Sequence, residues 1–312
     1  MTTAPTPTVS IVIPTYNHAK VLQHALQSVL DQTYTDWEAI VINNFSADNT
    51  IEVVESFRDP RIRLINFSNQ GVIAASRNVG IKAAQGDYVA FLDSDDTWYP
   101  NKLEKAMEIF RQRPDVDLVC HDVFALTQGR ITRTIRAGHE FPRMGTNTKL
   151  QDYLLFQGNH VATSTVVVRK AKLEEVGGFR ENREIISVED YDLWIRLSAV
   201  SKFYFLNLVL GEYCDDITGL SKNVDLHHGN LEILLKSYFS EALKIRPSLF
   251  LKWKIRRRLA SVYRGAAKIT PSQEQRKECI IKMLQTYPIG LKNLVTTAWW
   301  LGKLLSPGRP SK

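Results

Sequence analysis

The sequence lacks the features that mark disulfide-stapled, zinc-finger, exported or membrane-spanning proteins. Its 312 residues contain only three cysteines, at positions 120, 214 and 279, which are odd in number and far apart. Neither a disulfide framework nor a CxxC zinc site is therefore expected. The segment MTTAPTPT has no basic n-region and no apolar h-region, and no run reaches the roughly 18 apolar residues of a membrane span. These absences predict a protein of a reducing compartment that is neither exported by a signal peptide nor membrane-spanning.

Several catalytic and phosphate-binding motifs are also missing. The sequence has no GxGxxG, no GxxxxGK[ST], no GxSxG and no HExxH. Their absence disfavours a dinucleotide-dependent oxidoreductase, a P-loop NTPase, a serine hydrolase of the nucleophile-elbow type and a zinc protease.

The charge of the chain is divided unevenly along it. The total is +7, but residues 222–312 hold 18 Lys and Arg against five Asp and Glu, a net charge of +13, which leaves −6 for residues 1–221. A basic segment of this kind can serve nucleic acid, a membrane surface or an acidic ligand, and charge alone does not choose among them.

Short apolar runs alternate with helical patterns in the first 125 residues, and this alternation predicts an α/β fold. A mostly parallel, Rossmann-like central sheet should have helices on both faces. The expected strands are 9–13, 39–42, 61–66, 88–93 and 116–124, and the expected helices are 19–30, 46–57, 72–84 and 102–112.

After residue 125 the pattern becomes less regular. A β excursion is expected at 131–136, strands at 163–169 and 203–210, and helices near 150–156 and from residue 189. From about residue 226 only helical patterns remain, at 231–245, 249–263, 273–284 and 291–305, with Pro247, Pro271 and Pro288 between them. The chain should thus carry a C-terminal helical extension.

Polar clusters follow the predicted strands, at the edge of a parallel sheet where ligands bind. The strongest is Asp93-Ser-Asp-Asp96, because three carboxylates within four residues repel one another unless a cation compensates them. Mg²⁺ or Mn²⁺ would suit such a cluster and would leave positions open for phosphate oxygens. The alternative is that Asp95 or Asp96 caps the following helix or is solvated.

Five ordered motifs make the chain similar to the family 2 glycosyltransferases of GT-A fold over roughly residues 9–215. They are VSIVIPTYN from Val9, SVLDQTY from Ser28, ASRNVG from Ala75, GDYVAFLDSDD from Gly86 and VEDYDLW from Val188. The resemblance implies an inverting, metal-dependent glycosyltransferase that uses a nucleotide-diphosphate sugar and Mn²⁺ or Mg²⁺. The acceptor would be a hydroxyl of a saccharide or lipid-linked glycan in cell-surface polysaccharide synthesis.

The resemblance also implies roles for individual positions. Asp190 would be the catalytic base, and Asp93 and Asp95 would form the DxD pair, with Asp95 as the main metal ligand and Asp93 near the ribose. Trp98, Glu189 and Trp194 are candidates for acceptor binding. The residues expected to bind the nucleotide sugar are Pro14, Thr15, Tyr16, Asn17, Asn43, Asn44, Gly71, Arg77, Asn78, Asp93, Ser94 and Asp95. Each has a structural alternative: turn and packing roles for Thr15, Tyr16 and the tryptophans, a surface charge for Arg77, and a favourable helix dipole for Glu189 and Asp190.

Two departures from the family pattern leave alternatives open. Family members usually carry an Asp after the second strand where this chain has Asn43 or Asn44, so UDP is the first choice of nucleotide, with GDP or dTDP as alternatives. Some relatives have a metal- or phosphate-binding His after the last strand, where this chain has Tyr213-Cys-Asp-Asp216. Asp216 could replace that His or be structural.

The predicted organisation is a GT-A domain over 1–221 and a basic helical region over 222–312. Within the first, residues 1–125 would hold the nucleotide sugar and 126–221 the acceptor. The helices around Lys252–Arg258 and Thr297–Leu305 combine cations with Trp and Leu, which favours contact with an anionic membrane over packing alone. No nucleic-acid partner is expected, because aromatic stacking motifs on strands are missing.

The expected location is therefore the cytoplasm, peripheral on the cytoplasmic face of the inner membrane of a bacterium. Two other functions remain open. One is a nucleotide-sugar-binding or scaffold protein of the same fold that has lost catalysis. The other is a sugar-phosphate nucleotidyltransferase, although PTYN after the first strand is not the Gly-rich loop of that class.

Overall fold

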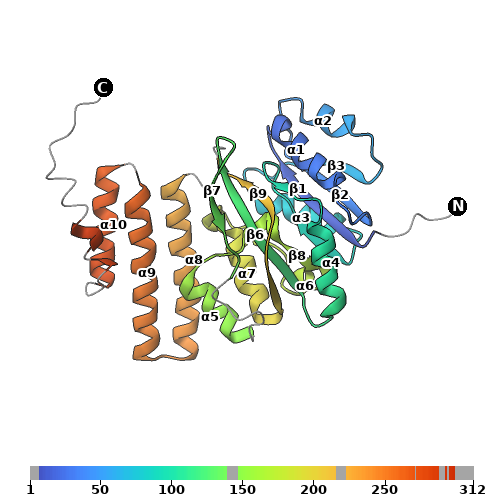
Figure 1. The fold of residues 1–312 in the computed structure, drawn as a ribbon. Helices are drawn as coiled ribbons and strands as arrows, with labels where there is room; N and C mark the ends of the chain where they lie inside the picture. Colours follow the sequence, from blue (N-terminus) through green and yellow to red (C-terminus); the bar gives the residue numbers. More distant parts are fainter. Residues whose placement is uncertain are drawn as a thin grey trace, which may run out of the picture. The chain divides into compact units, whose positions relative to one another are not determined.

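The chain divides into two compact units in the computed structural model (Figure 1). The first comprises Met1–Arg183 and Glu189–Thr218, and the second comprises Glu184–Val188 and Gly219–Lys312. The structure describes residues 7–138, 147–215, 223–270, 272–287, 292, 293 and 295–298. The boundary predicted between 221 and 222, Asp216, and most of the helix predicted over 291–305 lie outside the described residues.

Four parallel strands form the N-terminal part of the sheet in the order β3-β2-β1-β4. All seven residues of β1 and all seven of β2 are buried, and since successive side chains point to opposite faces, both faces of these strands are covered. The strands are β1 (Val9–Thr15), β2 (Trp37–Asn43), β3 (Ile62–Asn66) and β4 (Tyr88–Phe91), and the helices between them are α1 (Ala19–Leu30), α2 (Thr50–Ser56) and α3 (Ile73–Ala83).

The sheet continues as β4-β8-β6-β9-β5, with β7 paired to β6 outside this order. Here β8 is antiparallel to both β4 and β6, β9 is parallel to β6, and β5 is antiparallel to β9. The strands are β5 (Thr97–Trp98), β6 (Leu118–Thr127), β7 (Arg130–Ile135), β8 (Val167–Arg169) and β9 (Phe203–Cys214). The helices are α4 (Lys102–Gln112), α5 (Asn147–Gln157), α6 (Lys170–Glu175) and α7 (Glu189–Val200), with 3₁₀ turns η1 (Thr163–Thr165) and η2 (Arg183–Ile185).

The α/β fold with a C-terminal helical extension is thus confirmed, and the structure adds what the periodicity did not show. The sheet is parallel in its N-terminal half and mixed beyond β4. The two-residue β5 and the short α6 are too brief to produce a periodic signal. Only the last residues of the run predicted as a strand over 163–169 pair in the sheet, because Thr163–Thr165 form η1.

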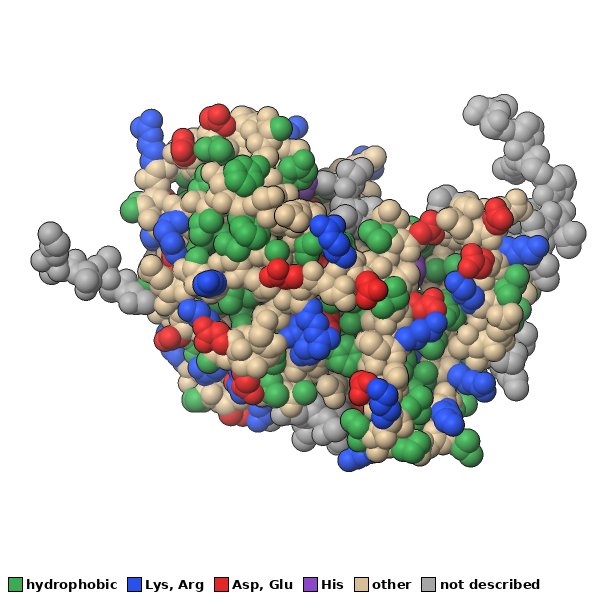
Figure 2. All heavy atoms as spheres, turned by 180° about the vertical axis from the view of Figure 1, so that it is seen from behind, with side chains coloured by type: hydrophobic (Ala, Val, Ile, Leu, Met, Phe, Trp, Pro, Cys, Tyr) green, Lys and Arg blue, Asp and Glu red, His purple; other side chains and the backbone are tan. Residues whose placement is uncertain are grey.

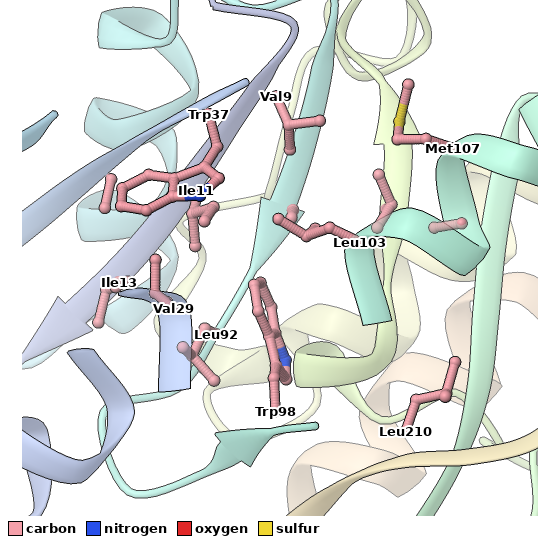
Figure 3. Close-up of a cluster of buried hydrophobic side chains, with 14 of the residues drawn as sticks. Val9, Ile11, Ile13, Val29, Trp37, Leu92, Trp98, Leu103, Met107 and Leu210 are labelled. Carbon is pink, nitrogen blue, oxygen red and sulfur yellow. The ribbon is translucent and has the colours of Figure 1, made fainter. Parts of the chain in front are cut away.

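A hydrophobic core fills the space between the sheet and its helices (Figure 3). Trp98 lies within it near Leu92 and Leu103, and the apolar stripe of α1 contributes Leu26 and Val29. The long buried strands and this helix stripe hold the strand ends in fixed register, which is what the site requires.

The second unit contains α8 (Val224–Ile245), α9 (Leu249–Ile269) and α10 (Gln273–Thr286). Each helix begins at a polar cap whose side chain accepts a hydrogen bond from the backbone N–H three residues on: Asn223, Ser248 and Ser272. The unit also includes residues 184–188, where the Asn230 Nδ2 donates to the Ile186 carbonyl at 2.9 Å. In the described ranges, no helix is both long and apolar enough to cross a membrane.

Candidate active site

The carboxyl ends of β1, β2 and β3 bring Thr15, Asn43 and Asn66 side by side in register. Asn43 is fully buried, its Nδ2 donates to the Asn66 Oδ1 at 2.8 Å, and its Oδ1 accepts from the Ser46 hydroxyl at 2.7 Å. The carbonyl oxygen of the neighbouring Asn44 side chain accepts from the backbone N–H of Asn69 at 3.0 Å. Both amides that replace the family's Asp are therefore engaged in holding the loops at this edge.

Two exposed aromatic side chains stand at the same strand ends. Tyr16 is 54% exposed and Phe45 63%. Phe45 and Asn17 both have a positive φ, of 52° and 53°, which non-glycine residues rarely adopt outside functional turns. Large aromatics turned outward beside polar strand ends provide flat surfaces on which a base can stack.

The carboxylates of the acidic cluster after β4 differ in how deeply they are buried. Asp96 is buried, and its carboxylate accepts from the Ser164 hydroxyl at 2.5 Å and from the Cys214 backbone N–H at 3.0 Å. Burial, reinforced by the charges of Asp95 and Asp93, raises the pKa of Asp96 well above its ordinary value. Asp96 is thus a structural member of the cluster that ties it to the chain before β8 and at the end of β9.

Asp95 is half-buried. Burial and the charge of Asp93 raise the pKa of Asp95 to about 6. Ser94 is buried, and its hydroxyl lies 2.8 Å from Nδ1 of His18 at the start of α1. The imidazole therefore stands beside the carboxylates, at the N-terminal end of a helix.

Arg77 is the cation that joins the two acidic parts of the site. It is 4% exposed, and its guanidinium donates to Asp93 at 2.8 Å and to Glu189 at 2.7 Å. Burial works to lower the pKa of Arg77, but the charges of Asp93 and Glu189 outweigh it and raise that pKa above its ordinary value. The chain thereby brings together residues 77, 93 and 189, which lie on α3, after β4 and at the start of α7.

Asp190 follows Glu189 in the first turn of α7. Its Oδ1 accepts from the Tyr191 backbone N–H at 2.6 Å, and its Oδ2 lies 3.2 Å from Nδ2 of Asn159 and 3.4 Å from the hydroxyl of Thr163. Burial and the charge of Glu189 raise the pKa of Asp190 to about 7, although Arg77 acts in the opposite direction. A half-buried carboxyl that titrates near neutrality is suited to accept a proton.

The carboxylates of the acidic cluster are of the type that a divalent cation needs, but the chain would supply few ligands to it. Burial and the charge of Asp93 raise the pKa of Asp95, and a cation would relieve the repulsion between these two carboxylates. One oxygen of Asp93 is occupied by Arg77. Among the described residues, no group of three or more His, Cys, Asp or Glu side chains is assembled for a metal. A site with one or two protein carboxylates leaves most positions to phosphate oxygens and water, as Mg²⁺ and Mn²⁺ allow.

Several predicted residues have structural contacts instead of an open surface. Trp98 and Trp194 are buried, and their indole N–H groups donate to the backbone carbonyls of Ser164 at 2.7 Å and Val161 at 3.1 Å. Both tryptophans therefore pack in the core, which is the structural alternative to the acceptor binding expected of them from the sequence. Pro14 is likewise buried within β1.

Asn78 and Gly71 shape the loops around α3. The side chain of Asn78 accepts a hydrogen bond from the Phe179 N–H and donates one to the Phe179 carbonyl, both at 2.8 Å. Gly71 has φ of +81°, a conformation that favours glycine, and its N–H donates to the Asn69 side chain at 2.9 Å. Asn78 thus fastens the segment before η2, while Gly71 opens the turn that leads into α3.

The sequence analysis missed four residues that the structure places at this edge: His18, Phe45, Asn159 and Ser164. The first two lie inside the polar segments that follow β1 and β2, so their position was a usable signal. Asn159 and Ser164 lie 66 and 71 residues after Asp93, and only the pairing of β8 with β4 brings their segment next to the acidic cluster.

Comparison with known proteins identifies the family of the chain. The family model for glycosyl transferase family 2 matches residues 10–177. An uncharacterized glycosyltransferase of Rickettsia conorii is 32% identical over 237 residues, which are 75% of this chain and 38% of the relative. A hyaluronan synthase of Pasteurella multocida is 33% identical over 65% of this chain and 20% of its own length. The chain thus spans well under half of either relative.

Solved structures show the same fold at low sequence identity. TarS 1–349 from S. aureus, in complex with UDP-GlcNAc, superposes with a TM-score of 0.63 at 17% identity, over 95% of this chain and 92% of that one. A mannosyltransferase from Pyrobaculum calidifontis, in complex with GDP-Man and Mn²⁺, gives a TM-score of 0.56 at 16% identity, over 96% and 86% of the two chains.

Proposed function

Because the chain belongs to glycosyl transferase family 2, we propose that it is an inverting, metal-dependent hexosyltransferase. It moves a sugar from a nucleotide-diphosphate donor to a hydroxyl of a saccharide or lipid-linked glycan in cell-surface polysaccharide synthesis. The observation that carries the proposal is the Arg77 bridge, which joins the acidic cluster after β4 to the Glu189–Asp190 pair at the start of α7. A donor-side cluster and a candidate base are thereby held at one edge of the sheet.

In the proposed reaction, Asp190 accepts the proton of the acceptor hydroxyl as its oxygen forms a bond to the anomeric carbon. The bond from that carbon to the diphosphate oxygen breaks on the opposite face, which inverts the anomeric centre, and the nucleoside diphosphate leaves with the bonding electrons. Arg77 pairs with Glu189, and the charge of Glu189 adds to burial in raising the pKa of Asp190.

Asp95, with Asp93 beside it, would hold the Mn²⁺ or Mg²⁺ ion, which neutralises charge on the leaving diphosphate. The crowded carboxylates support this role, and the Pyrobaculum mannosyltransferase is described with Mn²⁺.

A UDP-sugar is the proposed donor. TarS is described with UDP-GlcNAc, and the Pasteurella relatives include hyaluronan and chondroitin synthases. Thr15, Tyr16, Asn17 and Phe45 would surround the base at the ends of β1 and β2. GDP stays an alternative donor nucleotide, because the side chains of Asn43 and Asn44 are hydrogen-bonded within the protein and do not select uracil.

We assign the nucleotide sugar to residues 1–125 and the acceptor to residues 126–221. The proposed place of work is the cytoplasmic face of a bacterial inner membrane, with peripheral contact through the basic C-terminal helices. The net charge of +13 over residues 222–312 and the bacterial origin of the relatives support this location.

The decisive experiment compares Asp190→Asn with the wild type. Transfer, or slow hydrolysis of a UDP-sugar in the presence of Mn²⁺, should fall by about 10² to 10⁴, whereas protection by UDP against thermal unfolding should be unchanged. Asp31→Asn, which alters an exposed carboxyl at the end of α1, is the matched control and should be fully active.

Two results would contradict the proposal. An active Asp190→Asn variant would remove Asp190 from the role of base. A wild type that binds UDP-sugars but neither transfers nor hydrolyses them, with or without Mn²⁺, would instead indicate a binding or scaffold protein of the same fold.

A further inference from the structure

The junction of α8 and α9 exposes an unusual concentration of large apolar side chains. Every residue from Lys244 to Phe250 is exposed, and so are Lys252, Trp253, Arg256 and Arg257 on the first turns of α9. We call residues 244–257 the α8–α9 corner. The exposed fractions of its large apolar side chains are 74% for Ile245, 86% for Leu249, 68% for Phe250 and 40% for Trp253.

The buried face of α9 does not include Leu249, Phe250 or Trp253, although the Trp253 ring lies 6.5 Å from the ring of Tyr287. Further along α9, Ile255, Leu259 and Val262 supply the buried face. The apolar residues of the corner occupy the other side of the first turns, where Phe250 and Trp253 stack on each other with ring centres 5.8 Å apart. A contiguous exposed apolar surface of this kind marks an interaction site, since scattered exposure would need no explanation.

The charge around the corner has one sign. From residue 242 to residue 273 there is no Asp or Glu, whereas there are nine Lys and Arg. Arg257 lies over the ring of Trp253 at 5.5 Å, and Lys244 pairs with Glu241 at 2.6 Å on the preceding helix turn. The exposed aromatics therefore lie in a stretch of the chain whose charged side chains are all cationic.

We infer that the α8–α9 corner docks on an anionic lipid bilayer, with Leu249, Phe250 and Trp253 inserted at headgroup depth. The surrounding cations face the lipid phosphates. The apolar side chains of the corner suit the hydrocarbon region of a bilayer, and its Lys and Arg side chains suit the anionic headgroups. Leu and Ile side chains make no base-stacking or hydrogen-bonding contact with a nucleic acid. In Figure 2, hydrophobic and basic side chains adjoin one another at this lower tip of the helical unit. The inference rests on the proposed peripheral location and names the surface that provides it.

The test measures co-sedimentation of the full chain with vesicles, without donor or acceptor. Vesicles of phosphatidylcholine are compared with vesicles in which phosphatidylglycerol replaces a third of that lipid. The wild type should bind the anionic vesicles and not the neutral ones. Lys252→Gln combined with Arg256→Gln should weaken binding by about 25-fold at low salt, at roughly fivefold for each cation removed. Phe250→Ser combined with Trp253→Ser should abolish sedimentation at 0.15 M salt.

The last turn of the same helix provides matched controls. Lys268 is exposed and Ile269 is 59% exposed, about 18 Å or more from Arg256 along the helix, which exceeds the Debye length of about 10 Å at 0.1 M salt. Lys268→Gln and Ile269→Ser should bind vesicles like the wild type. Circular dichroism shows whether each variant is folded, and since all altered side chains are exposed, none should lose helix content.

Four results would overturn the inference. The first is that the wild type does not bind anionic vesicles at low salt, and the second is that corner and control variants lose vesicle binding equally. The third is that the wild type binds an oligonucleotide but not vesicles. The fourth is that the wild type binds no vesicles and forms a dimer, which Phe250→Ser with Trp253→Ser converts to a monomer. UDP-sugar hydrolysis by the corner variants should equal that of the wild type. Failure of the docking inference and failure of the proposed function are therefore separate observations.

Discussion

Lowering the pH from 8 to 6 should reduce the transfer rate about tenfold, because Asp190 must be ionised to accept a proton. Its pKa is raised to about 7 by burial and by the charge of Glu189. The carboxylate fraction is then about 90% at pH 8 and about 10% at pH 6. Since the raised pKa belongs to an acid that acts as a base, activity rises with pH and levels off above about pH 8. The assay is kcat/KM for a UDP-sugar measured from pH 5 to 9.

Asn159 provides the variant that tests the cause of this pH dependence. Its amide donates to the Asp190 carboxylate at 3.2 Å and thereby lowers the pKa of that group. Asn159→Ala should move the inflexion upward by about half a pH unit without changing the plateau rate. Asn159 is exposed, so the fold should be unaffected. A wild-type inflexion at or below pH 5, or a profile that Asn159→Ala leaves in place, would refute the reasoning.

Three further predictions concern buried or half-buried polar groups and are checked by denaturant unfolding. Arg77→Met should lower the free energy of unfolding by about 3–5 kcal/mol, because it leaves two carboxylates without their cation, and Arg77→Lys should recover part of the loss. Asn78→Ala should cost about 2 kcal/mol, because the N–H and carbonyl of Phe179 lose their partner; an effect on nucleotide affinity alone would argue for a ligand role instead. Lys102→Met should stabilise the protein at pH 7, because burial lowers the pKa of this amine well below its ordinary value and the unfolded chain therefore binds one more proton. Wild-type stability should rise with pH toward 10.5, and the variant should lack that rise.

The N-terminal half of the fold was predictable because its signals are local. Pairs of apolar residues four apart predicted a helix over 19–30, and α1 has those bounds. The runs that became β1 and β2 are buried on both faces, which makes them continuous apolar stretches that the sequence displays directly. Polar residues that follow such runs must lie at one edge of a parallel sheet, so the clusters after β1, β2 and β4 could be placed together in advance.

The acceptor side of the site was less predictable because it is assembled by non-local pairing. Insertion of β8 between β4 and β6, antiparallel to both, brings Ser164 to Asp96 and places Thr163 and Asn159 beside Asp190. A strand of three residues, such as β8, is too short for its sequence pattern to predict which strands it pairs with.

The sequence by itself determined the α/β architecture, the family resemblance and the chemical nature of the cluster at 93–96, because each depends on residue type and spacing along a short stretch. Tertiary structure alone decided which groups are free to act. It buried Trp98, a candidate for acceptor binding from the sequence, and occupied the amide of Asn43 with neighbouring side chains. It also joined Arg77 to Glu189, 112 residues away, and so set the charge that surrounds Asp190. Burial and charge pairing depend on distances between segments remote in the chain, and those distances exist only once the sheet has formed.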